Sequence, residues 1–128
     1  CSFFTNPSEQ QRLNIEEFND IQAWGIFRGF GRYLSQGIPT VTYLEADSKL
    51  SNGELKFNYS IEDNGGINKK SIEVYLDQKE IDFNYSSAKG LLKINVDNIK
   101  KGEHEIKIVA ANKNGNYALP FIQKFVYK

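Results

Sequence analysis

The chain of 128 residues contains no methionine, one cysteine, one histidine and one tryptophan, and its 16 basic residues balance its 16 acidic ones. A charge balance of zero argues against a nucleic-acid partner, since such partners are bound through an excess of lysine and arginine. With one histidine and one cysteine, we find neither a catalytic triad nor the four ligands of a structural zinc site. No apolar run approaches the roughly 20 residues that span a bilayer. We therefore expect a protein that is not an enzyme and needs no cofactor.

The single cysteine is residue 1, and Ser2 follows it. An unpaired cysteine is unusual in a secreted domain. Cys1-Ser2 resembles the mature start of a bacterial lipoprotein, in which a lipid is attached to the cysteine sulfur. This resemblance implies a lipid attachment site at Cys1 and anchoring at a membrane surface, whereas an artificial chain end or a tag remnant would explain the same residues.

Residues 1–37 have the hydrophobic spacing of a helix. Asn14 followed by Glu17 has the spacing of a capping box, so a helix is predicted to begin near Asn14. Two apolar stripes lie along the segment, offset by roughly a third of a turn. Either the helix breaks around Trp24 and Gly25, or its apolar surface winds around the axis. We expect a bent or two-piece helix, because each glycine costs about 1 kcal/mol relative to alanine.

From residue 38 to residue 128 the hydrophobic period is two, which is typical of strands. Turn residues rich in Asn and Gly recur at intervals of about ten residues. The predicted strands are 40–44, 54–62, 71–77, 81–85, 92–96, 103–111 and 118–127. Seven short strands separated by frequent turns predict a mainly β fold, either a sandwich or a small barrel.

Several segments resemble bacterial immunoglobulin-like and fibronectin-like repeats of surface proteins and secreted glycosidases. These are the turn 63–67 with the strand 71–77, the strand opening 101–106, and the segment 110–116. Gln78 and Asn112 stand where the repeats more often have Gly and Asp. The resemblance implies a seven-stranded immunoglobulin-like β-sandwich that works outside the cell. It also implies that His104 is structural, with a ring nitrogen that satisfies a nearby backbone group.

One loop of the β region has residues that suit calcium. Asp63, Asn64 and Asn68 offer hard oxygen ligands beside two glycines. Turn formation explains the same three residues, and calcium prefers six or more oxygen ligands. We expect no bound metal, and we name these residues as the candidates if one is bound.

The aromatic part of the helical segment is the main candidate interaction site. Its candidate partner-binding residues are Trp24, Phe27, Arg28, Phe30, Arg32 and Tyr33. Such a segment could pack on the sandwich, contact a partner chain or a second copy, or lie on a membrane. Because its aromatic residues occupy more than one side of the helix, partner contact is preferred to membrane contact.

Two functions follow from these features. The first is a non-catalytic cell-surface structural, assembly or adhesion subunit, whose helical segment makes partner or self contacts. The alternative is a polysaccharide-binding or spacer module of a secreted carbohydrate-active protein. That alternative predicts a row of exposed aromatic residues, with Tyr75, Tyr85 and Tyr117 as candidates.

Overall fold

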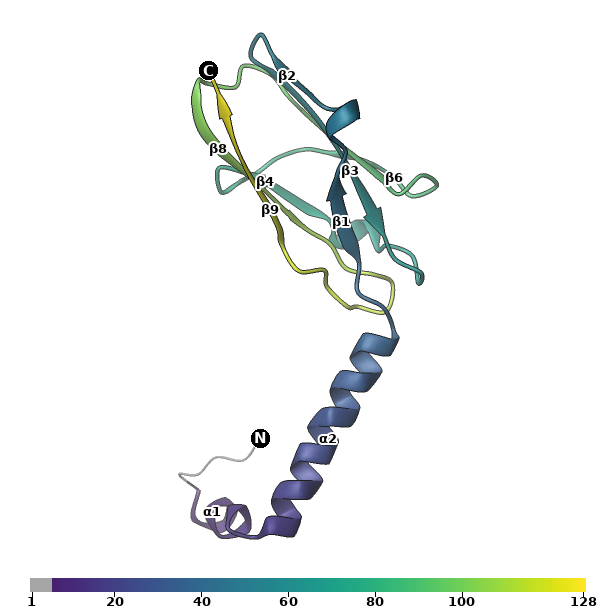
Figure 1. Cartoon of the computed structure of the whole chain (residues 1–128), viewed down its shortest axis with the longest axis vertical. Helices are drawn as coiled ribbons and strands as arrows, with labels where there is room; N and C mark the ends of the chain where they lie inside the picture. Colours follow the sequence, from purple (N-terminus) through teal and green to yellow (C-terminus); the bar gives the residue numbers. More distant parts are fainter. Residues whose placement is uncertain (1–5) are drawn as a thin grey trace. The chain divides into compact units, whose positions relative to one another are not determined.

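The computed structural model describes residues 6–128 and divides the chain into two units (Figure 1). The first unit ends at Ser35 and the second spans Gln36–Lys128. This division falls two residues before the boundary expected from the sequence. Cys1, the expected lipid attachment site, lies outside the described residues.

The first unit contains helix α1 (Pro7–Leu13) and helix α2 (Glu16–Ser35). Helix α2 begins two residues after the predicted start near Asn14, but Asn14 is the C-terminal cap of α1, so the predicted capping box is wrong. The predicted break at Trp24 and Gly25 is also wrong, because α2 runs through both residues over its 20 positions. Glycine lowers helix stability but leaves the backbone hydrogen bonds intact, whereas proline would remove one.

The second unit consists of two antiparallel sheets (Figure 1). The first sheet has the order β1-β3-β7-β6, and β2 also pairs with β3. Its strands are β1 (Thr40–Tyr43), β2 (Lys49–Ser51), β3 (Glu54–Glu62), β6 (Asn84–Ser86) and β7 (Leu91–Val96). The second sheet has the order β5-β4-β8-β9. Its strands are β4 (Glu73–Leu76), β5 (Lys79–Glu80), β8 (Gly102–Val109) and β9 (Phe121–Tyr127).

The sheets contain nine strands within residues 36–128, where seven were predicted. The predicted strand 81–85 does not form as one strand. The chain leaves the second sheet after β5 and joins the first sheet at β6, so the residues between them cross from one sheet to the other. The additional strand β2 is short and pairs with the beginning of β3, whereas β1 pairs with its end.

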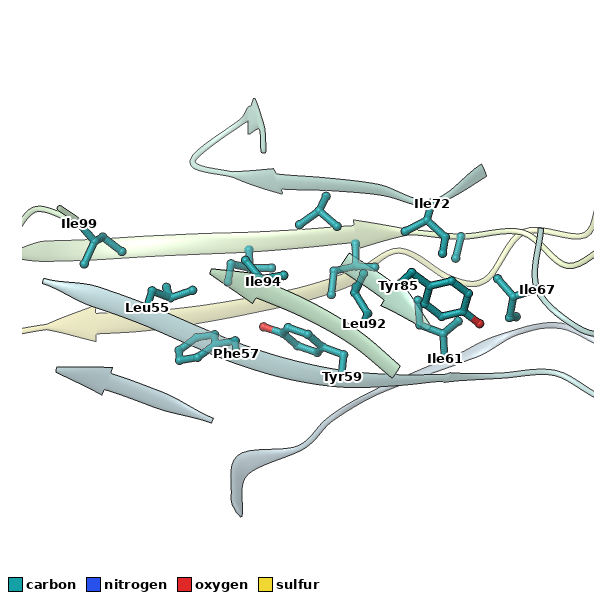
Figure 2. Close-up of a cluster of buried hydrophobic side chains, with 14 residues drawn as sticks. Leu55, Phe57, Tyr59, Ile61, Ile67, Ile72, Tyr85, Leu92, Ile94 and Ile99 are labelled. Atoms are coloured by element: carbon teal, nitrogen blue, oxygen red, sulfur yellow. The ribbon is translucent and has the colours of Figure 1, made fainter. Parts of the chain in front are cut away.

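Apolar side chains from both sheets form one core (Figure 2). Leu55, Tyr59 and Leu92 of the first sheet are fully buried, as are Ile106 and Ile108 of the second. Each such side chain stabilises the fold by about 1.5–3 kcal/mol relative to exposure. The alternation of buried and exposed residues along β3 is the period of two seen in the sequence.

Aromatic contacts join the two sheets. Phe57 of β3 meets Phe125 of β9 edge to face, with ring centroids 5.2 Å apart. Tyr59 meets Phe121 in the same way at 5.5 Å, and its hydroxyl donates to Oε1 of Gln123 at 2.9 Å. A buried tyrosine needs such a partner, because an unpaired hydroxyl in the core is costly.

Candidate interaction site on helix α2

Helix α2 exposes large apolar side chains, and none of its residues is buried. Its most exposed aromatic rings are those of Phe27 (65%), Phe30 (64%) and Trp24 (60%). Ile21, Ile26, Tyr33 and Leu34 are exposed as well. Exposed apolar side chains of this size make α2 the candidate interaction site.

The predicted interaction residues lie on different sides of α2. The rings of Trp24 and Phe27 stack on one side, with centroids 5.5 Å apart and planes 18° apart. Phe30 and Tyr33 lie on another side, where they line a shallow apolar hollow of about 360 Å³ together with Ile26 and Gly29. The sequence predicted aromatic residues on more than one side of this segment, but it did not separate these two groups.

Arg28 and Arg32 border a separate hollow of about 520 Å³ on α2, which Gly25 and Gly29 also line. A Cβ atom added at either glycine would meet nothing within 4 Å, so the glycines leave this surface open. The six predicted residues are therefore distributed around the helix and do not form one stripe.

The charges of α2 are separated along its axis. Glu16 and Glu17 lie in the first turn, and Asp20 follows one turn later. Arg28 and Arg32 are the basic residues of the helix, and Arg32 lies in its last turn. This order matches the helix macrodipole, which favours anions near the N-terminus and cations near the C-terminus. Over the described part of the chain, no helix is long and apolar enough to cross a membrane.

Helix α1 covers part of α2 near its N-terminal end. Leu13 of α1 is half-buried, as are Phe18 and Gln22 of α2. The side chain of Asn19 donates to the Leu13 carbonyl oxygen at 2.8 Å, which satisfies a group at the end of α1. The exposed rings of Trp24, Phe27 and Phe30 all lie beyond this contact in the sequence.

His104 of the sandwich is engaged through both ring nitrogens. Nε2 lies 2.7 Å from the Lys100 carbonyl oxygen, which confirms the predicted bond to a backbone group. Nδ1 lies 2.7 Å from Oδ2 of Asp77, a partner that the sequence did not reveal. Because both partners accept hydrogen bonds, this arrangement favours the doubly protonated ring. Neither nitrogen is available to act as a base on a substrate.

The pKa values of this pair shift in opposite directions. The hydrogen bond to Asp77, with a further one to Lys100, holds the pKa of His104 above its usual value. Burial would raise the pKa of Asp77, but hydrogen bonds from His104 and the Glu105 N–H outweigh it and hold that pKa below its usual value. The pair borders an open hollow of about 410 Å³, which Phe125 also lines.

Asn112 is fully buried and joins distant parts of the sandwich. Its Oδ1 accepts from the N–H groups of Asn114 and Asn116 at 3.0 and 2.9 Å. Its Nδ2 donates to the carbonyl oxygens of Gln36 and Gly37 at 3.2 and 3.1 Å. An aspartate in this position could not donate these bonds.

The candidate calcium ligands are engaged in local turns. Oδ1 of Asp63 accepts from the Gly65 N–H at 2.7 Å, and Oδ1 of Asn68 accepts from the Lys70 N–H at 3.1 Å. Within residues 6–128, no three His, Cys, Asp or Glu side chains are grouped to hold a metal ion. These local hydrogen bonds are typical of turns, so turn formation explains why Asp63 and Asn68 occupy these positions.

The three tyrosines that were candidates for polysaccharide binding do not form a row. Tyr85 is buried in the core, so its assignment to an exposed face is wrong (Figure 2). Tyr75 lies on β4, where its hydroxyl donates to Glu73 at 2.8 Å and Lys107 Nζ lies 5.8 Å from its ring centroid. Tyr117 is exposed in the connection between β8 and β9.

Comparison with solved structures places the sandwich among fibronectin type III-like folds. It is similar to fibronectin(III)-like modules of Clostridium thermocellum CbhA, with a TM-score of 0.52 and 21% identity over 70% of this chain and 46% of that one. It is also similar to the endo-beta-1,4-mannanase from Thermotoga petrophila, with a TM-score of 0.51 and 13% identity over 67% of this chain and 19% of that one. The chain thus spans less than half the length of either structure. No protein-family model and no curated protein matches the sequence.

Proposed function

We propose that the chain is a non-catalytic module of the cell surface, in which α2 makes protein contacts and the sandwich is displayed. The observation that carries this proposal is the exposure of Trp24, Phe27 and Phe30 on a helix with no buried residue. Lipid on Cys1 would hold the module at a membrane surface. Acyl chains found by intact mass measurement of the native protein would support that anchor.

The apolar area on α2 supports a contact of ordinary size. An aromatic side chain buries roughly 150–250 Å² when it is covered. With exposed fractions between 60% and 65%, the three rings alone therefore leave roughly 270–490 Å² accessible. Ile21, Ile26 and Leu34 add to this area. One side of a standard protein interface buries about 800 Å², so α2 offers a large share of such a surface.

A protein partner suits α2 better than a membrane surface does. A helix that lies on a bilayer has one apolar face and one polar face. On α2, however, the stacked pair Trp24 and Phe27 and the hollow formed with Phe30 and Tyr33 lie on different sides. A helix that is apolar on several sides is normally covered by protein.

A photo-crosslinking amino acid at position 27, in the full chain expressed in its own organism, tests this function. We expect light to attach the chain to a protein, because Phe27 would lie within the contact. The matched control carries the same group at Lys93, an exposed residue of β7. A position-27 chain that captures only lipid, or no protein beyond the Lys93 control, would contradict the proposal.

The similarity to modules of carbohydrate-active proteins supports a second candidate, an accessory module of such a protein. Tyr75 and Tyr117 are the remaining candidate platforms, since both lie outside the core. Affinity electrophoresis through gels that contain cellulose derivatives or mannan tests this candidate. Retardation that is lost in Tyr75→Ala would support it, and unchanged mobility in every gel would set it aside.

A further inference from the structure

Five exposed residues of α2 form a stripe with a symmetric chemical order. At 100° per residue, four exposed residues lie within about 60° of Trp24 around the helix axis. With Trp24 they form one set, which is Asp20, Ile21, Trp24, Phe27 and Arg28. We call this set the Trp24 stripe. Read outward from Trp24, it has an apolar residue three positions away in each direction. At four positions it has an acid on one side and a base on the other.

We propose that the occupant of this surface is a second copy of α2, packed antiparallel about a two-fold axis at Trp24. This inference rests on the proposed function and names its partner. In such a pair, a residue n positions before Trp24 lies level with the residue n positions after it in the other copy. Ile21 then lies level with Phe27, and Asp20 lies level with Arg28. Each contact occurs twice, and the two Trp24 rings meet at the axis.

The ends of the helix follow the same symmetry. Eight positions from Trp24 in each direction, Glu16 meets Arg32, which adds a second pair of opposite charges. Seven positions away, Glu17 meets Gly31. A Cβ atom added at Gly31 would meet nothing within 4 Å, so the glycine leaves space for the longer side chain.

The charges oppose a parallel pair. In a parallel arrangement Asp20 would face Asp20 and Arg28 would face Arg28, and each like pair would repel. The two helix dipoles would also point in the same direction, whereas antiparallel dipoles attract. Charge complementarity therefore selects the antiparallel arrangement.

The charges of the stripe have no partner within their own helix. Asp20 and Arg28 are eight residues apart, which is about 12 Å along a helix axis and too far for an ion pair. The ion pairs found in residues 6–128 include neither of them. A second copy supplies the missing partner for both residues.

A charge-exchange experiment with the full chain tests the antiparallel pair. We expect sedimentation velocity to show a dimer for the unmodified chain. Asp20→Arg alone and Arg28→Asp alone should each weaken it at least about tenfold, because both symmetric contacts become repulsive. Mixing the two variants should restore a heterodimer, since each arginine then faces an aspartate in the other chain.

Two further variants separate loss of the contact from loss of the fold. Phe27→Ala should weaken the dimer, whereas Phe30→Ala should leave it unchanged, because Phe30 lies outside the stripe at almost the same exposure. A monomeric unmodified chain would overturn the proposal. So would equal effects of Phe27→Ala and Phe30→Ala, or a mixture of the charge variants that stays monomeric.

Failure of this inference is distinguishable from failure of the proposed function. A monomeric chain whose position 27 crosslinks to a different protein in the cell would overturn self-pairing and support the broader function. A monomeric chain with no protein crosslink at that position would overturn both. A crosslinked species of twice the chain mass would support both.

Discussion

Replacing Asn112 with aspartate would reverse the polarity of the buried group that joins three parts of the sandwich. The side-chain amide of Asn112 donates to the carbonyl oxygens of Gln36 and Gly37 and to Oδ2 of Asp63 at 3.3 Å. The introduced carboxylate would place an acceptor against all three oxygens. The bonds that Oδ1 accepts from residues 114 and 116 could remain, so the change acts mainly on the donor side.

The expected loss of unfolding free energy is about 3–7 kcal/mol. Two like charges 3.3 Å apart repel by about 1–5 kcal/mol when the effective dielectric constant lies between 80 and 20. The carbonyl oxygens of Gln36 and Gly37 each lose a hydrogen bond of about 1 kcal/mol. Such a loss is a large fraction of the 5–15 kcal/mol that typically stabilises a domain.

Urea unfolding followed by circular dichroism near 215 nm, a wavelength sensitive to sheet structure, measures this loss at neutral pH. Asn114→Asp is the matched control. Its side chain is exposed and donates one bond, to Gln36, so its cost should stay below about 1 kcal/mol.

A second substitution checks the assigned contact. Asp63→Asn in the Asn112→Asp background should recover much of the lost stability, because the new amide can donate to the new carboxylate while its oxygen still accepts from Gly65. The reasoning would be refuted if Asn112→Asp unfolds within 1 kcal/mol of the unmodified chain. It would also be refuted if the double variant recovers nothing.

Two other predictions concern the hairpin between β4 and β5 and its neighbour His104. The raised pKa of His104 stabilises the fold at low pH, so this contribution should decline as the pH rises through values above the usual 6.5. The lowered pKa of Asp77 adds stability that declines as the pH falls through values below 3.8. In urea titrations, His104→Ala should flatten the fall in unfolding free energy that His104 causes as the pH rises. Asp77 and Gln78 both have positive φ, 49° and 68°, as a two-residue I′ turn requires. Gln78→Gly should raise the unfolding free energy by about 0.5–1 kcal/mol, and Gln78→Ala, the control, should give no such gain.

Period-two hydrophobicity was sufficient to predict most of the sandwich. Val74 of β4 and Ile106 of β8 are buried at positions where alternation placed them. The same signal predicted a single strand at 81–85, where the chain instead crosses from the second sheet to the first after β5. Tyr85 still points into the core, so the alternation there was kept while the strand was not. Alternation reports which side faces the core, and it does not report which sheet a residue joins.

Helix α1 was missed although its start signal is local. Asn6 accepts from the Ser8 N–H, and Pro7 occupies the first helical position, which is a common N-terminal pair. The donor role of Asn112 could not have been read in this way. Its partners at Gln36 and Gly37 lie 76 and 75 residues earlier, so only the folded chain brings them together.

The six candidate residues of α2 were found because aromatic and arginine side chains are enriched at interfaces. Their grouping required the structure, which separates the stacked pair Trp24 and Phe27 from the hollow lined by Phe30 and Tyr33. Only the first group belongs to the symmetric stripe.

Tryptophan fluorescence of the full chain across a dilution series tests most directly the claim that α2 is a contact surface for a second copy. Trp24 is the only tryptophan in the sequence, and it is 60% exposed in the single chain. In the antiparallel pair it lies at the two-fold axis and is covered. The account predicts emission at shorter wavelengths in concentrated solution and a shift to longer wavelengths on dilution. Emission typical of a solvent-exposed indole at every concentration would contradict it.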